Sequence, residues 1–116
     1  MEIFKWLDDS SFVSKYIIND FRESSTAFYL NLEVHFIDHS ILYVREFVEP
    51  ERRKYSFHWQ KNSGEVITRW DNAPHFPKIS TFPHHKHLGD ESVEQSFDIS
   101  LEAVLAHIKV SLLPME

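Results

Sequence analysis

The sequence predicts one α+β domain, 1–116, built as an antiparallel β-meander of four to six strands, with a C-terminal helix packed on one face and a short N-terminal helix. Three observations predict this fold. Apolar and polar residues alternate with period two through the middle of the chain. Turn residues separate the alternating segments. A helical apolar stripe follows them near the end of the chain.

The meander is expected in the first two-thirds of the chain. Its clearest strand is 27–37, where five apolar residues alternate with polar or aromatic ones, as on a half-buried strand. A turn around Asp38 leads to a return strand, and a later turn holds Gly64 at a position that favours positive φ. The segment 13–23 fits a helix or a strand, and we read it as a strand. The expected strands are 13–23, 27–37, 41–48, 54–60 and 66–70.

Helices are expected at both ends of the chain. Ser100 is a good N-cap for the C-terminal helix, and Pro114 is expected to end it. Helical spacing of apolar residues over 3–7 predicts the short N-terminal helix. Three prolines in 71–87 predict a long loop rather than a central strand or a helix, and 90–96 reads as an acidic linker. The stripe of the C-terminal helix consists of Leu101, Val104, Leu105, Ile108 and Leu112.

The composition excludes several kinds of site. The absence of cysteine excludes disulfide scaffolds, thiolate nucleophiles, iron–sulfur clusters and cysteine-ligated zinc fingers. Two glycines are too few for a glycine-rich phosphate-binding loop. The opening residues, MEIFKWLDD, lack the apolar run of a signal peptide, and no apolar run approaches the roughly 20 residues of a membrane helix. We therefore expect a cytoplasmic protein with no membrane partner.

Positive charge and histidine are concentrated in one part of the chain. The net charge of −6 at first disfavours a nucleic-acid partner. However, 52–86 holds seven basic and two acidic residues, a local charge of +5, so the remainder carries −11. Five of the eight histidines lie in 52–87. This pattern indicates an anion-binding face on an acidic protein, unless folding scatters the same charges over the surface.

Residues from three segments are expected to converge. His58, Arg69 and Asp71 lie near the paired ends of two strands on either side of the Gly64 turn. The following loop must return near the same rim of the sheet. His85 and His87 are two residues apart, so an extended segment places both imidazoles on one side. The loop histidines are His75, His84, His85 and His87.

This set suits metal-free cleavage of an RNA phosphodiester, with no cofactor. One histidine would take the proton of a ribose 2′-OH and another would protonate the leaving oxygen, since the histidine pKa lies near physiological pH. Asp71 would orient a histidine, and Arg69 or Lys86 would stabilise charge on the phosphate. Aromatic rings would stack bases. The catalytic candidates are His58, Asp71, His75, His85 and His87, and the substrate-binding candidates are Arg69, Lys86, Trp59, Trp70, His84 and Phe82.

A metal site is the first alternative. His85 and His87 have a spacing that suits Zn²⁺ or another divalent metal with an open coordination position, as in a metal-dependent hydrolase. The third ligand would come from His75, His58 or Asp71.

A non-catalytic protein that docks a partner through its aromatic rim is the second alternative. Each candidate also has an ordinary structural interpretation. His58 suits a half-buried, hydrogen-bonded strand position, and Arg69 with Asp71 suits a surface ion pair. Trp59 and Trp70 suit the hydrophobic core.

Three motifs follow one another along the chain: YSFHWQ at 55–60, RWDNAPHFP at 69–77 and TFPHHKHLGDE at 81–91. Together they resemble the TumE-type toxin family of prokaryotic toxin–antitoxin pairs, which was earlier catalogued as a domain of unknown function. The resemblance covers 41–113 and is densest at 54–91. The chain departs from the family pattern at Phe57, where the family has tyrosine, and at Phe76, where it has the second histidine of a P-H-H-P run.

The resemblance implies a small growth-inhibiting toxin that a small cognate antitoxin neutralises. It implies no particular mechanism. The ribonuclease interpretation depends on the residue chemistry and on the fact that many small toxins of this kind cut RNA. A homodimer and a hetero-oligomer with the antitoxin both fit this picture.

Overall fold

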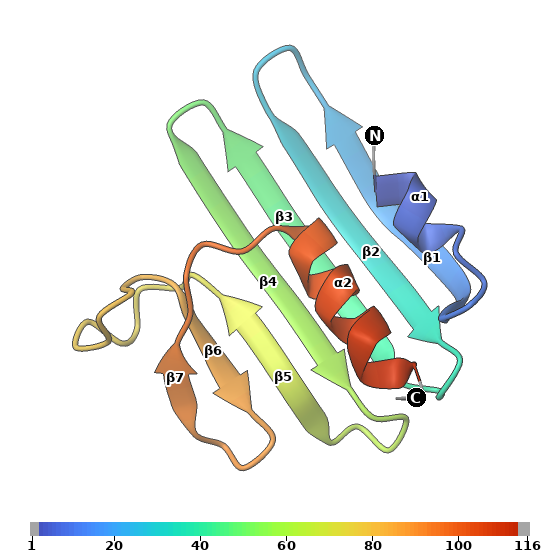
Figure 1. The fold of residues 1–116 in the computed structure, drawn as a ribbon. Helices are drawn as coiled ribbons and strands as arrows, with labels where there is room; N and C mark the ends of the chain where they lie inside the picture. The colour runs from blue at the N-terminus through green and yellow to red at the C-terminus, as the bar shows by residue number, and fades with distance from the viewer. Residues whose placement is uncertain (1–2, 114–116) are drawn as a thin grey trace.

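A computed structural model describes residues 3–113 and arranges them as a seven-stranded antiparallel sheet with two helices on one face (Figure 1). Each strand pairs with its neighbour in the chain, so the sheet is a meander in the order β1 to β7. The predicted α+β class and both terminal helices are confirmed. The strands are β1 (Val13–Glu23), β2 (Phe28–Phe36), β3 (Ile41–Glu49), β4 (Arg52–Gln60), β5 (Val66–Asp71), β6 (His85–Leu88) and β7 (Val93–Gln95). The helices are α1 (Ile3–Leu7) and α2 (Leu101–Leu112).

The five predicted strands correspond to β1 to β5, including the ambiguous segment 13–23. Gly64, in the turn between β4 and β5, has φ +96°, a conformation that glycine adopts without steric cost. The period-two pattern of β2 buries alternate apolar residues on one face of the sheet, as expected for a half-buried strand. These residues are Leu30, Leu32, Val34 and Phe36.

Two further strands correct the predicted strand count. The sequence predicts a loop throughout 71–87 and a linker at 90–96, whereas β6 pairs with β5 and β7 pairs with β6. The prolines exclude pairing where they stand, but Pro83, the last of them, precedes the first paired residue. β6 and β7 have only four and three residues and are mostly polar, so they lack the periodicity by which strands are predicted.

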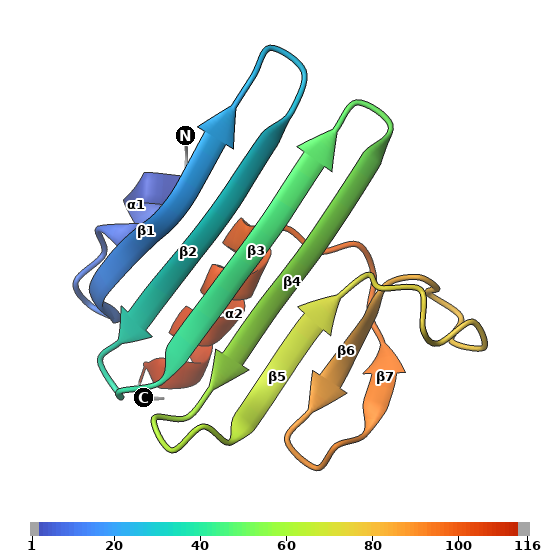
Figure 2. The same ribbon diagram turned by 180° about the vertical axis from the view of Figure 1, so that it is seen from behind.

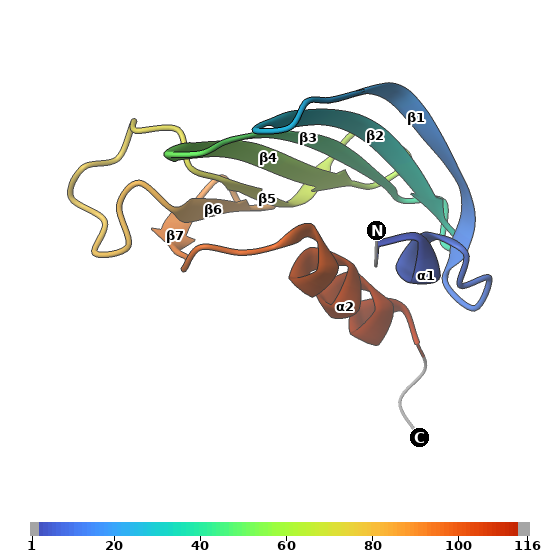
Figure 3. The same ribbon diagram turned by 90° about the horizontal axis from the view of Figure 1, so that it is seen from above.

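Helix α2 lies over the sheet, roughly along the direction of its strands (Figure 1), and α1 lies beside it; Figure 3 shows the sheet curving over both. The Oγ of Ser100 accepts a hydrogen bond from the amide of Ala103 at 3.1 Å, so the predicted N-cap is confirmed. Ile3 and Leu7 of α1 are buried. Pro114, the predicted end of α2, lies outside the described residues. The buried residues of α2 are Leu101, Val104, Leu105 and Ile108.

The sheet has two faces of different character. We call the side covered by α1 and α2 the helix face, and the opposite side, seen in Figure 2, the open face. Because side chains alternate along a strand, Phe57 of β4 is buried on the helix face while Ser56 and His58 point to the open face. The histidine-rich part of the site lies on the open face.

An ion-pair network holds the segment that leads into α2 against the sheet. The Nε of Arg53 lies 2.8 Å from Oε2 of Glu46, and its Nη1 lies 2.5 Å from Oδ1 of Asp98. The Nη2 of Arg53 also donates to the carbonyl of Ile99 at 2.8 Å. The guanidinium lies 4.2 Å from the ring centroid of Tyr55, which adds a cation–π contact. Arg53 therefore fixes where α2 begins relative to β4.

Candidate active site

Strand pairing brings five predicted site residues together on the open face of β4, β5 and β6. His58 pairs with Arg69, and Arg69 in turn pairs with His87. In the next row, Asp71 pairs with His85. Directly opposed residues of antiparallel strands have Cβ atoms roughly 4.5–5.5 Å apart, so their side chains are within reach of one another.

Asp71 is the centre of this group. Its Oδ1 lies 2.9 Å from Nε2 of His85, and its Oδ2 lies 3.5 Å from Nε2 of His87. The two Nε2 atoms lie 3.1 Å apart. Asp71 and His85 are buried, whereas the His87 side chain is 29% exposed. We call these three residues the Asp71–His85–His87 cluster; His87 is its most accessible member.

The hydrogen bonds of His85 require a proton or a cation inside the cluster. Its Nδ1 lies 2.9 Å from the carbonyl oxygen of Pro83, which can only accept, so Nδ1 carries a hydrogen. A neutral His85 would then direct the lone pair of Nε2 at the carboxylate of Asp71. Such a contact between two acceptors at 2.9 Å is repulsive. The cluster thus needs a proton or a bound cation between these atoms.

Arg69 links the cluster to His58. Its Nε donates to Oδ2 of Asp71 at 3.2 Å, and its Nη1 lies 3.3 Å from Nδ1 of His58. Because a guanidinium only donates, Nδ1 of His58 accepts this bond. The Nε2 of His58 then donates to Oε1 of Gln60 at 3.2 Å. Both ring nitrogens of His58 are thus engaged, in the neutral form of the imidazole.

Two imidazoles of the site, those of His58 and His87, favour the neutral form. Burial and then the charge of Arg69 lower the pKa of His58. Burial also lowers the pKa of His87; the charges of His85 and Arg69 act in the same direction, and Asp71 opposes them. A neutral imidazole at physiological pH can accept a proton, which is the property that a general base needs.

Phe76 covers the buried side of the cluster, a role that sequence reasoning missed. Its ring centroid lies 4.8 Å from that of His85 and 5.7 Å from that of His87, both edge-on. The ring therefore packs against both imidazoles. The only sequence signal was an aromatic residue within a proline-rich loop, where the family pattern has histidine.

The structure corrects the predicted base-stacking role of Trp59 and Trp70. Both lie on the helix face and are only 4% exposed. Each ring meets His107 of α2 edge-on, at 6.1 Å and 5.7 Å between centroids. The Nε1 of Trp59 donates to Oγ of Ser40 at 3.0 Å. A base cannot stack on rings packed beneath a helix, so the core interpretation holds for both.

His84 and Lys86 also lie on the side of β6 away from the cluster. His84 stacks on Tyr55, and its Nδ1 lies 2.9 Å from the Tyr55 hydroxyl. Lys86 pairs in register with Trp70, and its Nζ lies 4.0 Å from a carboxylate oxygen of Glu94. Side chains alternate between the two faces along an extended chain. His85 and His87 point to the open face, so His84 and Lys86 point to the helix face.

The two remaining candidates lie on the loop between β5 and β6. His75 is exposed, and within residues 3–113 its side chain has no hydrogen bond or ion pair. It directly precedes Phe76, so the chain places it beside the cluster. Phe82 is 45% exposed and follows on the same loop.

The cluster also has the donors of a metal site. One nitrogen from each of His85 and His87 and one oxygen of Asp71 all lie within 4.8 Å of one another. Neither His58 nor His75, which the sequence offered as third ligands, belongs to this group of atoms.

Comparison with known proteins supplies the family. Within the described part of the chain, no helix has the length and apolar character needed to span a membrane. No curated protein and no solved structure matches the sequence. A family model described as Toxin TumE matches residues 3–112. The chain therefore belongs to the TumE toxin family, as its three motifs predicted.

Proposed function

We propose that this toxin is a metal-independent ribonuclease that works through the Asp71–His85–His87 cluster. The observation that supports it best is the position of His87: a partly exposed imidazole with a lowered pKa, backed by the carboxylate of Asp71 and next to the cation of Arg69. Attack of a 2′-OH on a phosphodiester requires a general base, and it is helped by a carboxylate that orients this base and by a cation that binds the phosphate.

In this reaction His87 is the general base. Its Nε2 faces Asp71, while Nδ1 has no hydrogen-bond partner among the described residues. Nδ1 accepts the proton of a ribose 2′-OH as the 2′-oxygen bonds to phosphorus. The P–O5′ bond breaks, and the departing 5′-oxygen receives a proton from an imidazolium. The products are a 2′,3′-cyclic phosphate and a 5′-hydroxyl.

We assign the acid to His75 and the phosphate contact to Arg69. His85 is too buried to reach a leaving group, and both nitrogens of His58 are already engaged. His75 is exposed beside the cluster, and its side chain has no hydrogen bond or ion pair within residues 3–113. Arg69 keeps its Nε on Asp71 and directs its remaining N–H groups outward to the phosphate, whose negative charge grows in the transition state. His58 positions Arg69.

The test is cleavage of RNA by purified protein in EDTA. Wild type should cleave, and His87→Ala and His75→Ala should cleave far more slowly. His39→Asn is the matched control, because His39 lies outside the site at φ +71°, which asparagine tolerates well. No cleavage by wild type, or equal cleavage by wild type and His87→Ala, would overturn the proposal.

A metal-dependent hydrolase is the second candidate, favoured by the spacing of the cluster. Ligand atoms about 2.0–2.1 Å from a tetrahedral Zn²⁺ stand about 3.3 Å apart. Here the two Nε2 atoms of His85 and His87 lie 3.1 Å apart, and the oxygen of Asp71 nearest to each lies 2.9 Å from His85 (Oδ1) and 3.5 Å from His87 (Oδ2). The Pro83 carbonyl orients His85 through its other nitrogen, as outer groups commonly do for zinc-binding histidines.

The same assay separates the two candidates. Activity in EDTA, with no metal found by elemental analysis of untagged protein, supports the metal-independent route. Activity that EDTA abolishes and Zn²⁺ restores supports the hydrolase instead. In either case we propose that the protein acts in the cytoplasm and that a small cognate antitoxin silences it, as the family suggests.

A further inference from the structure

We infer that the open face beside the cluster binds single-stranded RNA, with Arg45 and Lys54 contacting phosphates and Tyr43 stacking on a base. We call these three residues the RNA track. The inference builds on the proposed ribonuclease function, because it names the form of substrate that the same site receives. None of the three residues takes part in the chemistry described above.

The track lies in a hollow of the open face that begins at the candidate active site. The hollow is lined by His58 and Arg69 at one end and reaches Asn19 and Asn31 at the other. Tyr43, Arg45 and Lys54 line it between these ends. A strand of nucleic acid lying in the hollow would therefore pass the cluster.

The strand register places the track beside the reacting groups. Arg45 pairs with Ser56, and Ser56 pairs with Asp71, so Arg45 stands two strands from the cluster in the same row. Tyr43 pairs with His58 in the adjacent row. Neighbouring strands are about 4.8 Å apart, so the backbone of Arg45 lies about 10 Å from that of Asp71. A few nucleotides span this distance.

Arg45 and Lys54 differ from most cations of this protein. Arg22 binds Asp20 at 2.9 Å, Lys109 binds Asp9 at 2.8 Å, and Arg52 and Arg53 also have carboxylate partners. Arg45 and Lys54 are both exposed, and neither has a carboxylate partner in residues 3–113.

Cations outnumber carboxylates in the lining of the hollow. Two carboxylates line it, Glu33 and Glu46, and Glu46 lies 2.8 Å from Nε of Arg53. The cations that line it are Arg45, Arg52, Lys54 and Arg69. The net charge of the lining is therefore positive, which complements a phosphate backbone.

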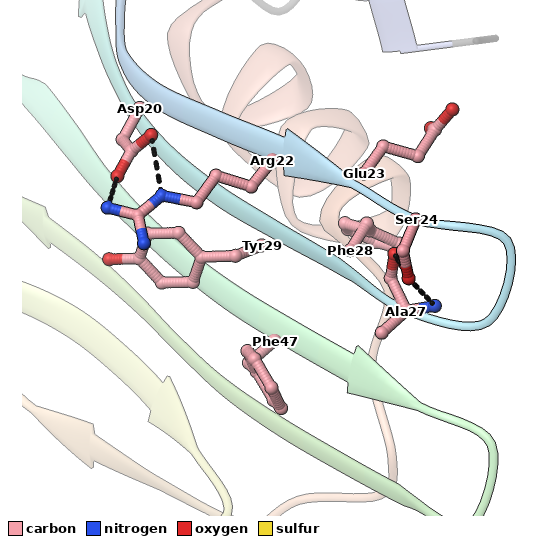
Figure 4. A pocket seen from close by; sticks show the side chains of 8 residues that line it. All are labelled: Asp20, Arg22, Glu23, Ser24, Ala27, Phe28, Tyr29 and Phe47. Atoms are coloured by element: carbon pink, nitrogen blue, oxygen red, sulfur yellow. Dashed lines mark hydrogen bonds and ion pairs between the residues drawn. The ribbon is translucent and has the colours of Figure 1, made fainter.

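Exposed aromatic rings accompany the free cations. Tyr43 is 39% exposed, and its ring lies 6.3 Å from that of His58. Tyr29 and Phe47 form a further pair at 6.4 Å. Both also line a second hollow at the β1–β2 hairpin; Figure 4 shows its lining residues, which include the Asp20–Arg22 ion pair. Cations interleaved with aromatic rings are typical of surfaces that bind single strands, because every base offers a face for stacking.

The experiment measures RNA binding rather than cleavage. Fluorescence anisotropy with a labelled single-stranded RNA, in EDTA and on the His87→Ala background, keeps the RNA intact. Arg45→Ala and Lys54→Ala should each raise Kd several-fold and reduce the slope of log Kd against log salt by about 0.7. Tyr43→Ala should raise Kd roughly fivefold or more, while Tyr43→Phe keeps the ring and should bind like the background.

Lys86→Ala is the matched control, because it removes the same charge from the helix face and should leave Kd unchanged. Equal weakening by Lys86→Ala, or unchanged Kd for Arg45→Ala and Lys54→Ala, would overturn the track. The track would also be overturned if an acidic peptide of equal charge displaced the labelled RNA as well as unlabelled RNA does.

These outcomes are distinct from failure of the proposed function. If wild type binds RNA through the track but cleaves none, the ribonuclease proposal fails and the track stands. If wild type cleaves RNA while the track variants bind normally, the track fails and the ribonuclease proposal stands.

Discussion

The Nε2 of His85 lies 2.9 Å from Oδ1 of Asp71, although the other ring nitrogen of His85 already faces the carbonyl of Pro83 at 2.9 Å. The pair therefore holds a proton or a cation in a buried position, and His87 lies on its accessible side. This arrangement explains why the chain keeps two histidines on one face of a four-residue strand.

Asp71→Asn removes the charge of the cluster while keeping its shape. We expect growth inhibition to be lost and RNA cleavage to fall roughly 10²–10⁴-fold, because His87 loses the carboxylate that orients it. Single-turnover rates on labelled RNA would measure this. Glu65→Gln is the control, since Glu65 pairs with Lys61 outside both the cluster and the hollow. A normal rate for Asp71→Asn would show that this carboxylate has no part in the reaction.

Arg53→Ala should lower the free energy of unfolding by about 2–3 kcal/mol, because Glu46 is buried and would lose its partner. Urea unfolding followed by tryptophan fluorescence measures the difference. Arg52→Ala is the matched control: its partner, Glu49, is more exposed, and we expect a change of about 0.5 kcal/mol or less. Equal effects of the two substitutions would mean that Arg53 does not hold α2 to the sheet.

Tyr55 should make the fold sensitive to alkali. Burial raises its pKa to about 12, from 10.0 in the unfolded chain. The folded state thus resists ionisation of this phenol, so its contribution to stability is complete below pH 10 and is lost as the pH rises toward 12. Unfolding measured from pH 9 to 12 should show this loss, and Tyr55→Phe should flatten the curve. A Tyr55→Phe curve parallel to that of wild type would contradict the assignment.

His58 should take up its proton at a lower pH than an ordinary histidine, because burial and then Arg69 lower its pKa. Its contribution to stability is present above the unfolded pKa and is lost as the pH falls through the folded value. Titration of the histidine ring protons by NMR gives the midpoint directly. Arg69→Gln should move that midpoint upward, whereas Lys61→Gln, an exposed cation paired with Glu65, should not. A midpoint at or above 6.5 in the wild type would contradict the environment described for His58.

The sequence predicts part of this site because strands with strong alternation of apolar and polar residues can be recognised and paired with their neighbours along the chain. The hairpin around Gly64 places His58 beside Arg69, and the spacing of His85 and His87 places both on one face. Local patterns could not supply the rest. β6 is short and polar, so the sequence does not show which of its side chains lie on which face of the sheet. Only the structure shows that Lys86 lies on the face away from the cluster.

Long-range packing hides other parts of the site from the sequence. The burial of Trp59 and Trp70 depends on α2, which follows them in the sequence only after β6 and β7. Phe76 contacts the cluster only because its loop folds back, and Arg45 reaches the hollow only through strand pairing. Phe76 stands in the motif at 69–77 but departs from the family pattern there, and Arg45 lies in none of the three motifs.

The most direct test of the central claim is mass spectrometry of the products formed from a single-stranded RNA in EDTA. We predict fragments that end in a 2′,3′-cyclic phosphate and begin with a 5′-hydroxyl, and we predict that they are absent with His87→Ala. Uncleaved RNA, or fragments with 3′-hydroxyl and 5′-phosphate ends, would contradict catalysis by His87.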